Sequence, residues 1–213
     1  MATRSKRLRV NAQRLLRSYD EELSVPETIF EALSRVQDRI AEETHCVERV
    51  VELDVDEEVI RLPDDFISIQ KVISTSTDQT SEIVGIDFTQ VDRLKRGVLS
   101  RSGEVPAQLL MYYYLWGQED NREIRFLLSD GSAPSSTITV NLYYWALPED
   151  MTEDIEPEVP RRWETTLLYG AVSDLTQEPK FLSLYDNYFL SALRKEVSAR
   201  SVASQVPYND SYD

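Results

Sequence analysis

The spacing of apolar residues changes twice along the chain, from a helical period to a two-residue period and back. Near the N-terminus, apolar side chains step by four, three and four residues, which places them on one face of an amphipathic helix. These residues are Ile29, Leu33, Val36 and Ile40. A shorter helix is expected before this one, over residues 11–19. The chain therefore begins with a pair of helices.

Between the two helical regions the pattern alternates, as in strands that expose one face. The predicted strands are 47–53, 60–62, 66–74, 109–116, 124–128 and 138–144. We expect the first two to form a hairpin, and the last two to form another across Asp130-Gly131. The third strand changes phase near Lys71, which predicts a bulge. A short helix is expected over 88–96.

The helical period returns after Pro160 and stops at Glu178-Pro179, because proline disfavours helix in the residue before it. A last helix starts at Phe181, and its apolar stripe is wider than one neighbouring helix needs. We expect part of this stripe, including Tyr188 and Leu193, to bind a partner such as another subunit.

This order of elements predicts an α+β fold: a helical bundle formed by N- and C-terminal helices, with a central antiparallel β-sandwich insert. The predicted parts are 1–46 for the N-terminal helices, 47–148 for the insert, 149–198 for the C-terminal helices and 199–213 for an extended tail. With 213 residues and 41% hydrophobic content, the chain can bury one sizeable core. The tail is too polar to pack alone.

Acidic residues dominate the chain, because 38 Asp and Glu against 23 Lys and Arg give a formal net charge of -15. Such a surface is unsuited to holding DNA by its phosphates. Residues 1–17 are an exception, since they carry basic residues and no acid. This basic arm either touches DNA or an acidic partner, or is the solvated start of a helix. Residues 149–158 gather carboxylates without the spacing of a metal site.

His45 and Cys46 are the only histidine and cysteine of the chain, and they are adjacent. Neighbouring residues seldom aim at one substrate atom, and one of each is too few for a structural zinc site. We therefore expect them to mark the end of the helix that contains Ile40, and we predict no catalytic residue, cofactor or metal site. The lack of a signal peptide and of a long apolar run predicts a soluble protein made in a reducing cytoplasm.

Asp64 and Asp65 lie in a proline-containing turn, where hydrogen bonds of the turn explain them without catalysis. The aromatic residues at 112–114 and 116, together with the surplus carboxylates, raise the alternative of a carbohydrate-active enzyme or a glycan-binding β-sandwich module. A cleft lined by Tyr or Trp, with two facing carboxylates, would favour that class. Packing in a core or between subunits is the simpler interpretation of these aromatic side chains.

Three segments together resemble the head-to-tail adaptor proteins of tailed bacteriophages. The first is a Leu-Pro-x-Asp-Phe motif leading into Ile-x-x-Val, matched here by Leu62, Pro63, Asp65, Phe66, Ile69 and Val72. The second is the aromatic strand that ends Tyr143-Tyr144-Trp145-Ala146-Leu147-Pro148 before an acidic linker. The third is Tyr169-Gly170-Ala171 in the first of the two closing helices. Order and spacing agree over residues 20–195.

The resemblance implies a structural virion protein, not an enzyme, that joins the portal protein to the tail nozzle or tail tube protein in the virion neck. It implies a homo-oligomeric ring, usually a dodecamer, whose lumen passes DNA without specific binding, and no membrane partner. We expect the polar tail to dock on the portal through Tyr208 and Tyr212. Another phage neck or tail-completion protein, or a bacterial adaptor unrelated to phage, would show the same patterns.

Overall fold

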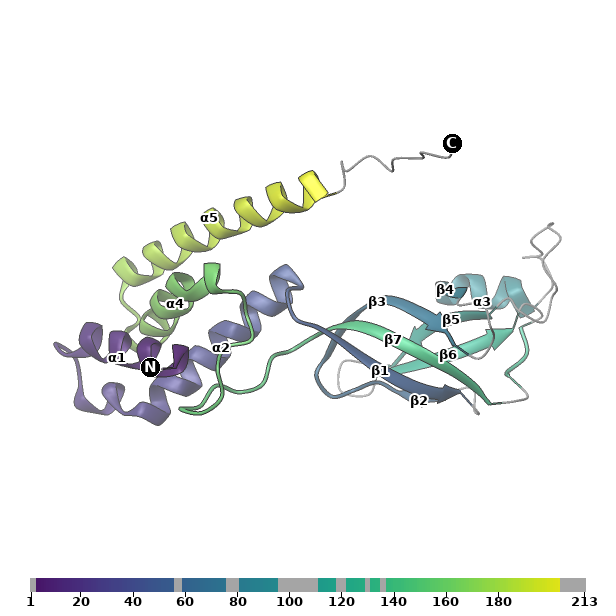
Figure 1. The fold of residues 1–213 in the computed structure, drawn as a ribbon, viewed down its shortest axis with the longest axis horizontal. Helices are drawn as coiled ribbons and strands as arrows, with labels where there is room; N and C mark the ends of the chain where they lie inside the picture. Colours follow the sequence, from purple (N-terminus) through teal and green to yellow (C-terminus); the bar gives the residue numbers. More distant parts are fainter. Residues whose placement is uncertain are drawn as a thin grey trace, which may run out of the picture. The chain divides into compact units, whose positions relative to one another are not determined.

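The chain folds into two compact units, one helical and one built on a β-sheet (Figure 1). The computed structural model describes residues 3–55, 59–75, 81–95, 111–117, 122–128, 131–134 and 137–203, with the backbone alone for residues 81 and 196–203. The helical unit contains both ends of the chain, Met1–Val47 and Leu147–Asp213, and the second unit is Glu48–Ala146.

The described part of the helical unit is built mainly from α-helices. They are α1 (Arg4–Leu16), α2 (Pro26–Thr44), α4 (Glu164–Thr176) and α5 (Pro179–Ala203). Two short 3-10 helices, η1 (Glu21–Ser24) and η4 (Arg161–Trp163), precede α2 and α4. Helix α4 is central, because it packs against α1, α2 and α5.

The core of the helical unit forms around α2 and α4. The apolar stripe of α2 predicted from the sequence is completely buried, and Leu167 and Ala171 of α4 belong to the same cluster. The ring of Trp163, also fully buried, lies 5.3 Å from the ring of Phe189 on α5. Gly170 lies at the tightest point, since a Cβ there would be 2.7 Å from Val36 Cγ1 and 2.9 Å from Tyr185 Cδ2. Burial of these side chains is the main source of stability of this unit.

Helix α1 starts earlier than the sequence pattern predicts and ends at Leu16, so the expected helix over 11–19 is only partly right. Its buried side chains are Ser5, Leu8, Ala12 and Leu16, which follow a helical spacing. The basic residues around this stripe obscure it in the sequence. The side chain of Thr3 caps the helix by accepting a hydrogen bond from the Lys6 amide at 3.3 Å.

The strands of the second unit form one sheet in the described part of the chain. They are β1 (Glu48–Val55), β2 (Val59–Arg61), β3 (Phe66–Ser74), β4 (Ser81–Gly85), β5 (Met111–Trp116), β6 (Glu123–Leu128) and β7 (Ile138–Ala146). Their order is β1-β7-β3-β4-β5-β6-β2, and β4 pairs with β5 in parallel while the other pairs are antiparallel. Helix α3 (Phe88–Lys95) packs Val91 and Leu94 against Tyr114 and Leu127 of this sheet.

The predicted fold class, a helical bundle with an antiparallel β-sandwich insert, is wrong, because the described strands form a single mixed sheet. Edge strands β1 and β2 stand at opposite ends of the strand order, yet only residues 56–58 separate them in the chain. Val55 and Val59 therefore lie within about 15 Å of each other. The sheet must curl until its edges approach, as in a nearly closed barrel. The mixed α+β content is the part of the prediction that holds.

Neither predicted hairpin is present among the described strands. β1 pairs with β7 and β2 with β6, so the segments 47–53 and 60–62 are not partners. β6 lies between β5 and β2, while β7 lies between β1 and β3, so 124–128 and 138–144 are not partners either. An alternating pattern shows which side chains share a face, but it is compatible with any neighbouring strand.

Several other element predictions are confirmed. Helix α2 contains the predicted stripe, α4 ends before Glu178-Pro179, and α5 follows directly. The pairing of β3 with β7 shifts register between Ile69 and Lys71, where the phase change predicts a bulge. The short helix expected over 88–96 is α3.

Candidate functional site

Helix α5 presents large apolar side chains to solvent. Among its described side chains, Phe181 and Ala192 are buried, while Leu182 and Leu190 are 52% and 50% exposed. Leu182 borders the buried stripe and Leu190 lies nearly opposite it, about 12 Å farther along the helix, and both are outside the apolar positions that the sequence pattern singles out. Large apolar side chains left exposed on a helix are candidates for contact with a partner.

The two residues of α5 predicted to bind a partner lie in different environments. The Tyr188 side chain is 41% exposed, and its ring stacks on Tyr169 of α4 with centroids 5.4 Å apart and planes 3° apart. Leu193 is partly buried against the helical core. Leu182 and Leu190 are more accessible than either. The other predicted partner residues, Tyr208 and Tyr212, lie outside the described residues.

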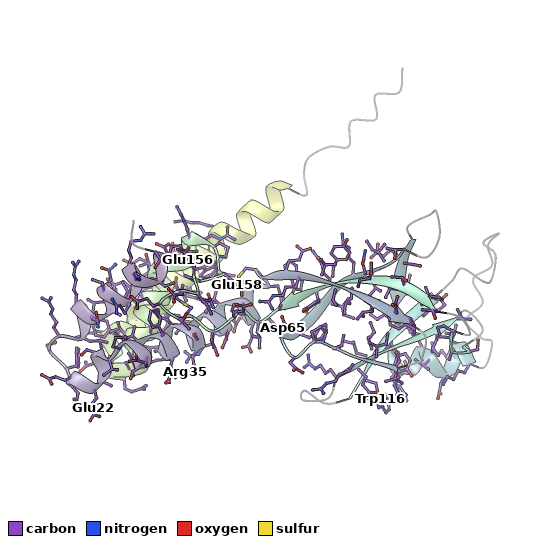
Figure 2. The ribbon with its side chains drawn as sticks, turned by 60° about the horizontal axis from the view of Figure 1, so that its bottom comes forward. Glu22, Arg35, Asp65, Trp116, Glu156 and Glu158 are labelled. Carbon is purple, nitrogen blue, oxygen red and sulfur yellow. The ribbon has the colours of Figure 1, made fainter. Side chains whose placement is uncertain are left out.

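A groove of about 530 Å³ runs along the polar face of α2, between this helix and the connector, residues 147–160. It is lined by apolar side chains of Pro26, Phe30 and Met151 and by several carboxylates. The carboxylates are Glu27, Glu31 and Asp38 from α2, and Asp150 and Glu153 from the connector. We call this feature the acidic groove. Figure 2 labels Arg35 on α2, the single cation among the lining residues that the structure describes.

The basic side chains nearest the acidic groove already form ion pairs with carboxylates of the helical unit. The guanidinium of Arg35 lies 3.7 Å from the carboxylate of Asp174 on α4. Lys6 and Arg9 of α1 approach Glu153 to 3.5 and 3.8 Å. These contacts leave most of the negative charge of the groove without a partner.

Four carboxylates of the groove make no salt bridge or side-chain hydrogen bond with any residue that the structure describes. They are Glu27, Glu31, Asp38 and Asp150. Burial raises the pKa of Asp38 from 3.8 to about 6, with further contributions from the negative charges of Asp150 and Glu42. The groove therefore favours a cationic ligand, which would relieve this repulsion.

The connector that forms one wall of the groove is fixed by hydrogen bonds to α2. The buried side chain of Gln37 donates from Nε2 to the carbonyl of Glu149 at 3.0 Å and accepts at Oε1 from the amide of Glu158 at 2.9 Å. Ser34 Oγ accepts from the amide of Met151 at 2.8 Å. Figure 2 shows Glu158 on this connector. These bonds hold the acidic segment in place against its own charge repulsion.

The exposed face of α1 carries the opposite charge. Arg7 and Arg14 of α1 and Arg17, the C-terminal cap of this helix, lie on the side away from the buried Leu8 and Ala12, and we call them the arginine ridge. Their side chains form no hydrogen bond or salt bridge within the described part of the chain.

The other basic residues of α1, Arg4, Lys6 and Arg9, bind acceptors within the helical unit. Arg4 is structural, since it donates from Nε to Glu164 at 2.7 Å and from its other guanidinium nitrogens to the carbonyls of Pro157 and Val159. Lys6 and Arg9 hold the connector through Glu153. Both interpretations of the basic arm therefore keep some support, because the arginine ridge is solvated while the other bases meet acids.

Asp65 of the Leu-Pro-x-Asp-Phe motif, labelled in Figure 2, joins two strands of the sheet. Its carboxylate forms an ion pair with Arg49 of β1 and accepts a hydrogen bond from Tyr144 Oη of β7 at 3.1 Å. Burial raises the pKa of Tyr144 to about 12, and the negative charge of Asp65 adds to the shift. Asp64 pairs instead with Arg61 at 3.0 Å on the surface. Asp65 thus makes side-chain contacts across strands, beyond the turn contacts that the sequence predicts.

His45 is the C-terminal cap of α2, as predicted, with a left-handed backbone (φ 49°) and its amide donating to the Ala41 carbonyl at 2.8 Å. Among the described residues, no group of three or more His, Cys, Asp or Glu side chains is arranged to hold a metal ion. Among the described residues that line the acidic groove there is no Tyr or Trp, so this lining offers no aromatic platform of the kind found in sugar-binding clefts.

The aromatic strand β5 is divided between core and surface. Tyr114 is buried beneath α3, as the packing interpretation predicts. Trp116, labelled in Figure 2, is 44% exposed and lies 4.8 Å from the ring of Phe88. Within the described residues, none of the helices combines the length and apolar character needed to cross a lipid bilayer.

The sequence matches the model of a known protein family. A family model described as SU10 adaptor protein matches residues 7–208 of the chain. The matched range includes residues of both units and nearly the whole sequence. The search of curated proteins found no match.

Proposed function

We propose a specific structural role for this chain from the premise that it belongs to the SU10 adaptor protein family, a family of phage head-to-tail adaptors. Copies of the chain form a ring, a dodecamer, between the portal protein and the tail nozzle or tail tube in the neck of the virion. The DNA exit channel runs through this ring. The chain acts by assembly, not by catalysis.

The exposed leucines of α5 are the observation that carries the ring. Leu182 and Leu190 are each at least half exposed in the single chain, although burial of one leucine side chain is worth about 2 kcal/mol. A neighbouring copy that covers the exposed half of each side chain would gain about half of this free energy per leucine. A closed ring requires one repeated contact of this kind between each copy and the next.

The net charge of -15 supports a lumen that passes DNA without holding it. A surface of the same sign as the phosphates repels the duplex and favours sliding over binding. The proposal assigns the portal contact to the C-terminal tail, where Tyr208 and Tyr212 would serve as aromatic anchors on the portal.

Assembly of purified chain on purified portal rings, viewed by electron microscopy, tests the proposal. The double variant Leu182→Ser/Leu190→Ser should keep its circular dichroism spectrum and lose complete rings. The matched control, Asn187→Ala/Ser191→Ala, changes two exposed polar positions of the same helix and should assemble as the unaltered chain does.

The outcomes separate the parts of the proposal. A single copy at the portal vertex would contradict the ring, and complete rings from the leucine variant would contradict the role of α5. Deletion of residues 204–213 should leave the fold intact and weaken attachment to the portal; unaltered attachment would exclude the tail as the portal contact.

A further inference from the structure

Two surfaces of the helical unit match each other in charge, length and spacing. One is the acidic groove along α2, and the other is the arginine ridge on α1. We propose that the arginine ridge of one copy docks in the acidic groove of the next copy. This inference rests on the proposed ring, and it names a pair of surfaces that would build the ring.

The spacing of charges along the two helices agrees when the helices run in opposite directions. With a rise of about 1.5 Å per residue, Arg7 and Arg14 are about 10.5 Å apart along α1, and Asp38 and Glu31 are about 10.5 Å apart along α2. The next steps, from Arg14 to Arg17 and from Glu31 to Glu27, are about 4.5 and 6 Å. The register therefore pairs Arg7 with Asp38, Arg14 with Glu31 and Arg17 with Glu27.

The apolar and small residues of the two faces fit the same register. Val10 lies on the ridge between Arg7 and Arg14, and it is only partly buried in the single chain. Ser34 lies between Asp38 and Glu31 on α2, and it lines the groove. In the proposed register Val10 is level with Arg35 and beside Ser34, whose small side chain leaves room for an apolar one, while Arg35 is already paired with Asp174. Antiparallel helices also place opposite ends of their dipoles side by side.

Electrostatics favours this occupant over others that carry positive charge. The pKa of Asp38 is raised to about 6, so the groove gains when a cation approaches this carboxyl. Lys6 and Arg9 already pair with Glu153 of the connector in the same copy, so α1 and this acidic segment are compatible partners. A divalent cation is less suitable, because no metal-holding group is present among the described residues. DNA is repelled by the groove.

The contact is heterologous, since it joins two different surfaces of the chain. Repetition of such a contact leads to a closed ring when the rotation between copies divides a full turn. Each copy then uses its ridge on one side and its groove on the other. The arginine ridge is consequently unavailable to DNA in the assembled ring.

A charge exchange on the full-length chain tests the docking. Arg14→Glu and Glu31→Arg each place like charges opposite one another, and each should weaken association between copies by about tenfold or more. The double variant Arg14→Glu/Glu31→Arg restores opposite charges and should recover most of the association. Copies bound per purified portal ring are counted by native mass spectrometry, with circular dichroism to verify folding.

Arg161→Glu is the matched control for Arg14→Glu, because it makes the same change in net charge at another exposed arginine of the helical unit. Loss with both single variants, recovery in the double variant and no loss in the control would support the docking. Equal loading of all variants, a double variant that stays defective while folded, or an equal loss in the control would overturn the docking and leave the ring standing. Failure of the unaltered chain to load in multiple copies would overturn the ring itself, and the docking with it.

Discussion

Helices α2 and α5 belong to the same unit but use their apolar residues in opposite ways. Helix α2 buries a complete stripe, with Ile29, Leu33, Val36 and Ile40 inaccessible to solvent. Helix α5 is the longer of the two, yet it keeps Leu182 and Leu190 at the surface. The apolar stripe of α2 serves the stability of one chain, whereas the two exposed leucines of α5 are accessible to a second chain. Burial, not hydrophobicity, distinguishes the two uses.

The largest expected effect separates the two helices directly. Leu33→Ala on α2 should lower the free energy of unfolding by about 2 to 5 kcal/mol, because it removes buried methyl groups and leaves a cavity. Leu190→Ala on α5 should change it by less than about 0.5 kcal/mol, because the side chain is half exposed. Urea denaturation of both variants measures the difference. Equal losses of stability in the two variants would show that Leu190 contributes to the folded chain as much as the buried Leu33 does, which would contradict the comparison.

A smaller effect is expected where the two helices meet on α4. Gly170→Ala adds a methyl group that would lie 2.7 Å from Val36 of α2 and 2.9 Å from Tyr185 of α5. Overpacking of this kind costs about 1 to 3 kcal/mol. The variant Val36→Ala removes one of the two neighbours, so Gly170→Ala should cost less in that background. A cost that is the same in both backgrounds would mean that α4 does not hold α2 at this point.

The smallest effect concerns the polar face of α2 and depends on pH. The folded chain raises the pKa of Asp38 from 3.8 to about 6, so the charged carboxylate opposes folding. This penalty is absent below about pH 4, grows as the pH rises to about 6 and is complete above it. Asp38→Asn should therefore stabilise the isolated chain at pH 8 by about 1 kcal/mol, a modest gain because the carboxyl is only half buried.

The same variant should have little effect near pH 4. The exposed Asp154→Asn makes the same change of net charge and is the matched control, with an expected change in stability of less than about 0.5 kcal/mol. Urea denaturation at the two pH values gives the comparison. A gain from Asp38→Asn at low pH, or an equal gain from both variants at pH 8, would contradict the assignment of the penalty to Asp38.

Helices were easier to predict than strand partners, and the reason is physical. A helix closes its hydrogen bonds within itself, so the spacing of Ile29, Leu33, Val36 and Ile40 was sufficient to locate α2. A strand takes its partner from elsewhere in the chain, and the alternation in β1 and β7 contains no information about that partner. The parallel pairing of β4 with β5 was missed for the same reason.

The family could be predicted from the sequence, whereas the surfaces could not. The Leu-Pro-x-Asp-Phe motif carried the resemblance that the family match confirms, and the structure shows its Asp65 bonded to Arg49 and Tyr144. The acidic groove joins Glu31 to Asp150, residues far apart in the sequence, so its formation depends on tertiary packing. The exposure of Leu190 also depends on what α5 packs against. No short sequence pattern predicts either the acidic groove or the exposure of Leu190.

β1 and β7 are the first and last strands in the sequence, and their pairing has a consequence for how the chain could have evolved. Glu48 and Trp145 are partners at the start of β1 and the end of β7, so the whole sheet unit enters and leaves through two neighbouring points. Such a unit is a cassette, because a shorter or longer segment with the same two ends could replace it without moving the helices. Doubling the length of an inserted loop costs only about 0.6 kcal/mol in closure entropy. Evolution could therefore exchange the cassette while the helical unit stays unchanged.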